Sequence, residues 1–287
     1  MAEPLVNWSL GVDWIWVASV VGVLYYVGIR RAGMTGPTWP LSRAAAFYAG
    51  LALYLGVILS PLDPYDNVSF FLHTAEHLIF VFMVAPLVAL GAPITLLLRA
   101  SPSRFRERRL LPLLDSRAAS ILIHPAATWL AFIGFFLATP LIAPLYNHSL
   151  SNGLLHLWEH NLYLITAFLF WWPIVGVDPV PRRVSFPARL VYLAAALPFV
   201  AFLGLTVLLE GDPLYPHYVS LPPPWGGRAA VISQHDGGIL LLVAGSVAVV
   251  CAMTLVMAAW MRDQDAQRPR VEGRIARGPV PKDLLDT

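Results

Sequence analysis

The sequence predicts an all-α fold: a polytopic membrane protein built as a bundle of seven transmembrane helices, with the N-terminus outside and the C-terminus inside. Composition is the first reason, because 57% of the 287 residues are hydrophobic and only 13% are charged, whereas soluble domains carry about 25% charge. Second, seven stretches reach or approach the roughly 20 apolar residues that a spanning helix needs. Third, the basic residues are confined to alternate linkers, as in a multi-pass protein.

The seven predicted spans follow one another with short linkers. Pro61 and an acidic turn over residues 63–66 close the second span, and Pro86 and Pro93 are expected to kink the inner half of the third. The third and fifth spans both enter from the outer side, so they run parallel. In chain order the spans cover about residues 14–29, 44–62, 68–98, 118–146, 152–177, 190–209 and 237–261.

The linkers set the predicted orientation. Eighteen of the 19 Lys and Arg residues follow the first, third, fifth and seventh spans, and only Arg228 lies on the other side. Cytoplasmic loops collect Lys and Arg, so these linkers are assigned to the inside. We therefore expect a transmembrane domain over residues 1–261 and a basic, disordered cytoplasmic tail over residues 262–287 near anionic headgroups. No basic region precedes the first apolar stretch, so no cleaved signal peptide is expected.

A His-x-x-Glu-His pattern occurs twice, and each copy leads directly into a long apolar stretch. Residues three and four apart share one face of a helix, so each copy places two imidazoles and a carboxylate on the same side. Ionisable groups in apolar helices are costly and usually face a bundle interior or a water-filled cavity. Both copies lie near the outer surface at a similar depth, which predicts one shared site. The copies are His73, Glu76 and His77 in the third span and His156, Glu159 and His160 in the fifth.

A metal centre is the leading interpretation of this site. Neutral imidazole suits copper and zinc, and two His pairs at i, i+4 offer four nitrogens to one ion. The two glutamates are expected to orient the imidazoles. The only cysteine, Cys251, lies in an apolar run, which excludes an intrachain disulfide and a thiolate cluster. The predicted ligands are His73, His77, His156 and His160, with Glu76 and Glu159 behind them.

Four further residues on the outer side are weaker candidates for the site. His148, His217 and His235 could pass an ion to it, although histidines in loops are more often simply solvated. Asp236 stands at the predicted mouth of the seventh span, where it could reach the site or cap that helix.

Three other interpretations stay open. The His-x-x-Glu-His spelling also occurs in zinc metalloproteases, so a membrane zinc hydrolase with Glu76 or Glu159 as general base is the runner-up. One His from each helix could instead ligate a haem. Alternatively, the histidines make polar contacts within a purely structural assembly scaffold. No Gly-rich phosphate loop or nucleic-acid-binding pattern occurs, so no nucleic-acid partner is expected.

Four stretches also carry a family resemblance. They are the first His pair with residues 85–93 (APLVALGAP), His124-Pro125, the second His pair with residues 170–181 (FWWPIVGVDPVP), and Gln234-x-x-Gly237-Gly238. Over about residues 40–260 the chain resembles the multi-span CtaG-type (Caa3/CtaG) family of cytochrome c oxidase assembly factors. Two departures concern the last stretch. Ser233 stands where the family often has Asp, and residues 239–242 are Ile and Leu where it often has Trp and acidic residues.

The resemblance implies a role in building the haem–copper oxidase, with copper handled on the outer face and the four histidines of the two pairs as ligands. We expect a non-enzymatic protein of the bacterial plasma membrane, surrounded by lipid, that binds one copper ion as Cu(I) and acts as its chaperone. The ion passes to an oxidase subunit or to a periplasmic copper carrier. Zinc is the alternative metal. A nitrogen-rich site without thiolates should release copper readily, which suits transfer.

Overall fold

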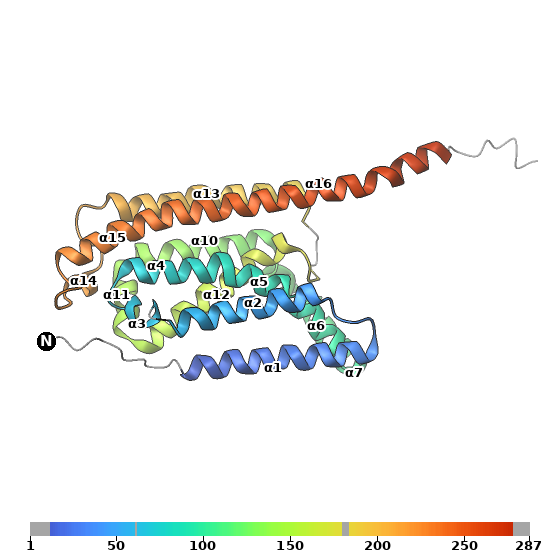
Figure 1. The fold of residues 1–287 in the computed structure, drawn as a ribbon, viewed down its shortest axis with the longest axis horizontal. Coiled ribbons are helices and arrows are strands. Elements are labelled where there is room, and N and C mark those ends of the chain that lie inside the picture. Colours follow the sequence, from blue (N-terminus) through green and yellow to red (C-terminus); the bar gives the residue numbers. More distant parts are fainter. Residues whose placement is uncertain (1–11, 61, 180–183, 278–287) are drawn as a thin grey trace, which may run out of the picture.

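The computed structural model of the protein describes residues 12–60, 62–179 and 184–277, and these residues form helices and connecting turns with no strand among them. Figure 1 shows the long helices lying side by side as a bundle. The α-helices are α1 (Val12–Thr35), α2 (Leu41–Ile58), α3 (Leu62–Asp66), α4 (Phe70–Ile79), α5 (Ala85–Leu90), α6 (Pro93–Ala100), α7 (Ser103–Phe105), α8 (Leu111–Leu114), α9 (Arg117–Leu122), α10 (Pro125–Leu141), α11 (Ala143–Ser151), α12 (Gly153–Val175), α13 (Phe186–Leu209), α14 (Pro216–Val219), α15 (Arg228–Leu240) and α16 (Ser246–Arg277). Three π-helical segments are η1 (Phe80–Val84), η2 (Arg106–Leu110) and η3 (Leu241–Gly245).

Among the described residues, five helical segments are long and apolar enough to cross a membrane. A sixth is added if α10 and α11 count as one span. Helix α12 has 23 residues but is not among the five, because His156, Glu159 and His160 lower the apolarity of its first turns. A multi-pass membrane protein is therefore confirmed, while the count of seven spans and their orientation stay predictions. The five segments are Ile15–Met34, Leu41–Ile58, Phe70–Ala100, Phe186–Leu209 and Arg228–Gln267.

The expectation of one continuous fourth span over residues 118–146 is wrong. Helix α10 begins at Pro125, after His124 caps it by accepting a hydrogen bond from the Ala126 N–H through Nδ1 at 3.2 Å. It ends at Leu141, and α11 leaves it at an angle of 80°. Pro144 stands in the first turn of α11, and proline disfavours a helical conformation in the residue before it and lacks the N–H that would continue the ladder.

The third predicted span is also interrupted. Helix α4 runs through η1 into α5, and the chain then breaks at Ala92, whose φ of 51° is left-handed, before Pro93 starts α6. The expected kink near Pro93 is therefore a change of helix. In η1 the helix widens to a π-helical turn. The carbonyl of Val81 in this turn accepts a hydrogen bond from the Trp171 Nε1–H at 2.6 Å.

The last span is longer than expected at both ends. It starts at Arg228 rather than Gly237, so Asp236 lies inside α15 and does not cap it. Residues 262–277 of the expected disordered tail are helical, because α16 continues to Arg277. Arg, Ala, Gln and Glu make up ten of these sixteen residues and favour helix, although Pro269 and Gly273 do not. Residues 278–287 lie outside the described residues, and the domain division at residue 261 stays a prediction.

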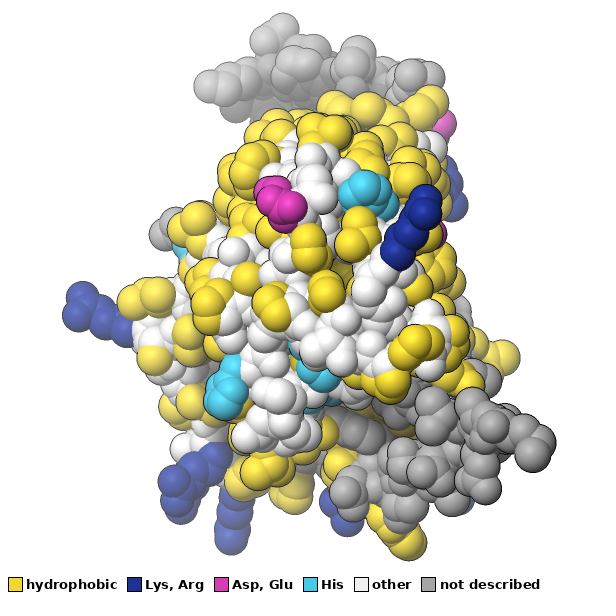
Figure 2. Space-filling view, turned by 90° about the vertical axis from the view of Figure 1, so that its left-hand side faces the viewer, with side chains coloured by type: hydrophobic (Ala, Val, Ile, Leu, Met, Phe, Trp, Pro, Cys, Tyr) yellow, Lys and Arg dark blue, Asp and Glu magenta, His cyan; other side chains and the backbone are white. Residues whose placement is uncertain are grey.

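Close packing brings α13 against α15 and η3. A Cβ on Gly204 would meet the Leu242 backbone nitrogen at 2.5 Å, and one on Gly238 would meet the Leu208 nitrogen at 2.6 Å. Small residues allow helix backbones to approach in this way in membranes. Helix α4 lies in the middle of the bundle, while α3, α11 and α14 gather at one end (Figure 1). Figure 2 views that end, where hydrophobic and uncharged groups cover most of the surface.

Candidate metal centre

Three elements bring a buried polar cluster together near the α3–α11–α14 end of the bundle. Ser69 caps the start of α4, where its Oγ accepts a hydrogen bond from the Leu72 N–H at 3.5 Å. Asn152 caps the start of α12, where its Oδ1 accepts a hydrogen bond from the Leu154 N–H at 3.1 Å. Each helix contributes one His-x-x-Glu-His face, and the third element, α3, contributes its last residue, Asp66. The cluster consists of Asp66, His73, Glu76, His77, His156, Glu159 and His160.

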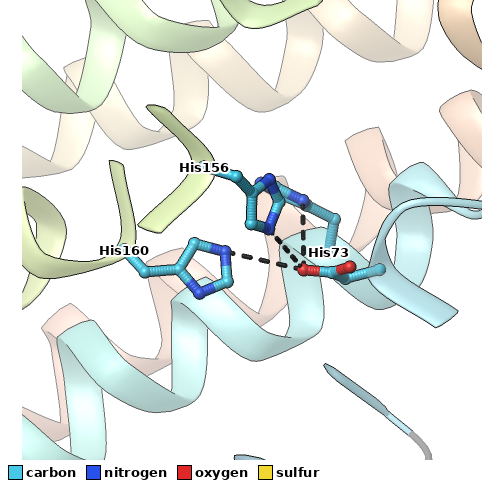
Figure 3. Close-up of side chains that lie close together, drawn as sticks. His73, His156 and His160 are labelled. Carbon is cyan, nitrogen blue, oxygen red and sulfur yellow. Dashed lines mark hydrogen bonds and ion pairs between the residues drawn. The ribbon is translucent and has the colours of Figure 1, made fainter. Parts of the chain in front are cut away.

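The first part of the cluster, which we call the outer group, is centred on one oxygen of Asp66. Asp66 Oδ2 lies 2.8 Å from His156 Nε2, 3.6 Å from His160 Nε2 and 3.9 Å from His73 Nδ1. Figure 3 shows the three imidazoles directed at that carboxylate. One ligand atom from each of the four residues lies within 4.8 Å of every other, a spacing that suits a single metal ion.

The second part of the cluster, the inner group, lies at the Nε2 edge of the His73 ring. His73 Nε2 lies 2.7 Å from His77 Nε2 and 3.8 Å from Glu159 Oε1. The Ser149 hydroxyl donates to Glu159 Oε2 at 2.5 Å and so fixes that carboxylate. His73, His77 and Glu159 are all buried and form a second candidate set of ligands. The sequence pattern predicted the four histidines together, whereas the structure divides them between two groups that share His73.

The two glutamates reach across the helix pair. Glu159 on α12 faces His73 on α4, and Glu76 on α4 faces His160 on α12, with 3.5 Å between Glu76 Oε1 and His160 Nδ1. Glu76 is 0% exposed and Glu159 is 5% exposed. Each carboxylate therefore lies at ion-pair distance from an imidazole on the opposite helix.

Residues of α14 hold the backbone beside Asp66. The Tyr218 hydroxyl donates to the Asp66 carbonyl at 3.1 Å, and His217 Nε2 lies 3.0 Å from the Asn67 carbonyl. Burial raises the pKa of Tyr218 well above its usual value, so this hydroxyl keeps its proton and can donate. His217 therefore fixes the loop that carries Asp66 and does not itself point into the cluster.

The other weak candidates lie away from the cluster. His148 is exposed on α11, His235 Nε2 lies 3.3 Å from the Glu210 carbonyl, and Asp236 is exposed on α15. None of them belongs to either candidate ligand group among the described residues. Asp66 is the residue that sequence reasoning missed. Its signal was the acidic turn ahead of α4, but nothing in the pattern placed that turn beside a histidine 90 residues further on.

Several buried donor and acceptor atoms of the cluster have no hydrogen-bond partner in the described part of the chain. Proteins leave few such atoms unsatisfied, because each costs about 1–3 kcal/mol. These atoms belong to side chains that meet in the cluster from three elements, so the donor set fits a cation. Imidazole nitrogens with carboxylate oxygens suit copper and zinc. The atoms are Asp66 Oδ1, His73 Nδ1, His77 Nδ1, Glu159 Oε1 and His160 Nε2.

Fold and site together define a multi-pass helical membrane protein with a buried His–carboxylate cluster suited to a metal ion. The chain belongs to the Caa3_CtaG family, described as cytochrome c oxidase caa3 assembly factors, whose family model matches residues 23–263. The resemblance seen in the sequence is thereby confirmed, and assembly of the oxidase is the family's role.

Curated relatives come from mycobacteria. The uncharacterized protein ML1998 of Mycobacterium leprae is 29% identical over 259 residues, which cover 85% of this chain and 38% of the relative. The uncharacterized protein Mb0105 of Mycobacterium bovis is 29% identical over 281 residues, which cover 93% of this chain and 41% of the relative. The chain therefore spans about two fifths of the length of these relatives. No solved structure matches it.

Proposed function

We propose that this chain binds copper in the cluster and supplies it to a haem–copper oxidase during assembly, either directly to an oxidase subunit or through a periplasmic copper carrier. The observation that carries the proposal is the convergence of His73, His156 and His160 on Asp66 Oδ2, inside a family of oxidase assembly factors. Copper is the cargo of such a protein and not a resident cofactor.

The donor set supports a transferable ion. Imidazole nitrogens bind Cu(I) well, and the Asp66 oxygen also serves Cu(II) or zinc, which keeps zinc as the alternative metal. The one cysteine, Cys251, lies on α16 and belongs to neither ligand group. A site without thiolate holds copper less tightly than a cysteine site, which favours release to an acceptor.

The surroundings of the cluster favour binding over hydrolysis. A hydrolase needs room for its substrate at the metal, yet the cavity that touches His73 and His77 has a volume of about 30 Å³. The large cavity of about 780 Å³ is lined by residues of α1, α6 and α12 and by none of the cluster. We therefore propose a non-enzymatic role.

Ring packing favours a bare ion over haem. The ring centroids of His77 and His160 are 4.7 Å apart, and those of His73 and His156 are 5.4 Å apart. A porphyrin between one histidine of each helix would have to separate these rings. The partnerless atoms argue against a purely structural scaffold, in which the same side chains would bond to one another.

The membrane setting is part of the proposal. Basic residues lie near the C-terminal end of α1, after α6 and in the C-terminal part of α16, at the end of the bundle opposite α3 and α14 (Figure 1). The positive-inside rule then puts the cluster near the outer surface of a bacterial plasma membrane, with the N-terminus outside. A periplasmic carrier or the copper-binding part of an oxidase subunit could reach that end.

A competition experiment tests this function. The protein is purified in mild detergent, offered Cu(I) and Zn(II) together, and its bound metal is measured by elemental analysis. The double variants H73A/H77A and H156A/H160A are compared with H148A/H235A, which removes two histidines outside the cluster. Less copper in both cluster variants than in the wild type and in H148A/H235A supports the proposal. Zinc in its place, or as much copper in both cluster variants as in the wild type, overturns it.

A further inference from the structure

His73 is placed to serve two ions. Its Nδ1 faces the outer group, 3.9 Å from Asp66 Oδ2, and its Nε2 faces the inner group, 3.8 Å from Glu159 Oε1. The two nitrogens of one imidazole point in different directions in the ring plane, so they cannot bind the same ion. A single ion in the outer group leaves His77 without a role in binding, although His77 is as deeply buried as the ligands.

We infer that the cluster holds two copper ions, one in the outer group and one in the inner group, bridged by the imidazole of His73. This inference rests on the proposed function, since it takes copper as the cargo, and it adds a second position to the site. The outer ion is held by Asp66, His156 and His160, and the inner ion by His77 and Glu159, with His73 shared.

Space for the inner ion exists beside the His73–His77 pair. The cavity of about 30 Å³ touches both imidazoles and also Tyr146 and Tyr163. About 10–15 Å³ is enough to hold one water molecule, so the cavity has the volume for a small ion beside the two imidazoles, although Glu159 does not line it. His77 Nε2 and His73 Nε2 now share one hydrogen bond at 2.7 Å. An ion placed between them would use both lone pairs, and the proton of that hydrogen bond would have to leave.

The charge of the cluster favours a bound cation and is compatible with two. Asp66, Glu76 and Glu159 are 1%, 0% and 5% exposed, so ionised forms would bring three negative charges together out of contact with water. Their ion-pair partners are imidazoles, at 2.8–3.9 Å. Buried charge is costly unless it is paired or coordinates a metal. The first Cu(I) ion offsets one of these charges. The second replaces the ring proton of His73, so it adds no net charge, and His77, His156 and His160 stay neutral, which is the form that binds metal.

Binding of the second copper ion requires His73 to lose a proton. A neutral imidazole carries one ring proton, so His73 can bind one ion with its free nitrogen. When the second ion binds the other nitrogen, that proton leaves to solvent and His73 becomes a bridging imidazolate. No oxidation or reduction accompanies the step, because copper keeps its charge.

The test is the number of copper ions per chain. The purified chain is titrated with Cu(I), and the tightly retained copper is counted for the wild type, H77A, H156A and the control D236N, which changes an exposed carboxylate of α15. The expected result is two ions in the wild type and in D236N and one ion in each of H77A and H156A. As a second measurement, the Cu(II)-loaded wild type is examined by electron paramagnetic resonance, and coupling between two Cu(II) ions should appear.

The outcomes separate the two claims. One ion in the wild type without spin coupling overturns the second position and leaves the proposed function standing. No copper at all overturns both. Because the wild-type count and the spectrum need no substitution, a variant that fails to fold does not weaken the test.

Discussion

Helices α4 and α12 carry the same five-residue pattern, yet they use it differently. On α4, His73 and His77 are 3% and 7% exposed, and His73 lies between the two ligand groups. On α12, the side chains of His156 and His160 are 14% and 11% exposed, and both face Asp66. The spacing of the pattern sets which residues share a helix face. It does not set what that face meets, and here a single carboxylate from α3 gives the two helices different roles.

The two glutamates differ in the same way. Glu159 is held by the Ser149 hydroxyl at 2.5 Å and belongs to a ligand group, whereas Glu76 lies against His160 Nδ1 at 3.5 Å and belongs to neither. We expect Glu159 to bind the inner ion and Glu76 to orient an imidazole of the outer group. Four substitutions test this division of roles.

The largest effect is expected from H73A. Because His73 is shared by both groups, its loss should remove all tightly bound copper, whereas H148A on the exposed face of α11 should remove none. Copper retained per chain after gel filtration is the measurement. If H73A kept as much copper as H148A, the shared role of His73 would be wrong.

The second largest effect is expected at Asp66, the carboxylate that gives α4 and α12 different roles. Asn in place of Asp66 keeps the size of the side chain but removes its charge. D66N should weaken copper binding in the outer group by at least about 10- to 100-fold, because that loss already follows when a group that only supports a metal ligand is removed. A Cu(I) affinity measurement against a competing chelator reports this change. D236N is the matched control, and equal affinities of the two variants would contradict the assignment of Asp66.

A smaller effect should follow from S149A, which removes the donor to Glu159 Oε2. The carboxylate then loses its fixed orientation, and copper binding in the inner group should weaken by about 10-fold. In a chelator competition, only the copper affinity of the inner group should change. S151A removes a neighbouring hydroxyl that bonds to the His148 carbonyl instead, and should change nothing. Weakening of the outer step in S149A would show that the groups are not separate.

The smallest effect is expected from Y218F. This change removes the hydrogen bond to the Asp66 carbonyl and the one shared with the Tyr146 hydroxyl at 3.0 Å, while the ring stays. The free energy of unfolding should fall by about 1–2 kcal/mol, and copper affinity should fall less than in D66N. A thermal unfolding midpoint in detergent, measured with and without copper, checks both statements. No change in either would mean that α14 does not position Asp66.

Periodic features of the chain could be predicted from the sequence. The i, i+3, i+4 spacing placed His73, Glu76 and His77 on one helix face, and matched depth paired them with His156 and His160. Features that are set by turns and tertiary packing could not be predicted from the sequence. The carboxylate of Asp66 arrives from a turn that has no period. Pro144 marks a break between α10 and α11, but it does not by itself set the angle of 80° between them. The division into two groups depends on ring orientation, which spacing alone does not determine.

The most direct test of the central claim is the copper content of the oxidase itself. A bacterial host that makes a caa3-type oxidase has its own copy of the gene replaced by the wild type, H73A or D236N, and the oxidase is purified and its copper and haem are measured. The account predicts that the wild type and D236N yield oxidase with full copper, while H73A yields haem-containing oxidase that is deficient in copper. Full copper in the oxidase from H73A cells would contradict the claim that this cluster supplies the metal.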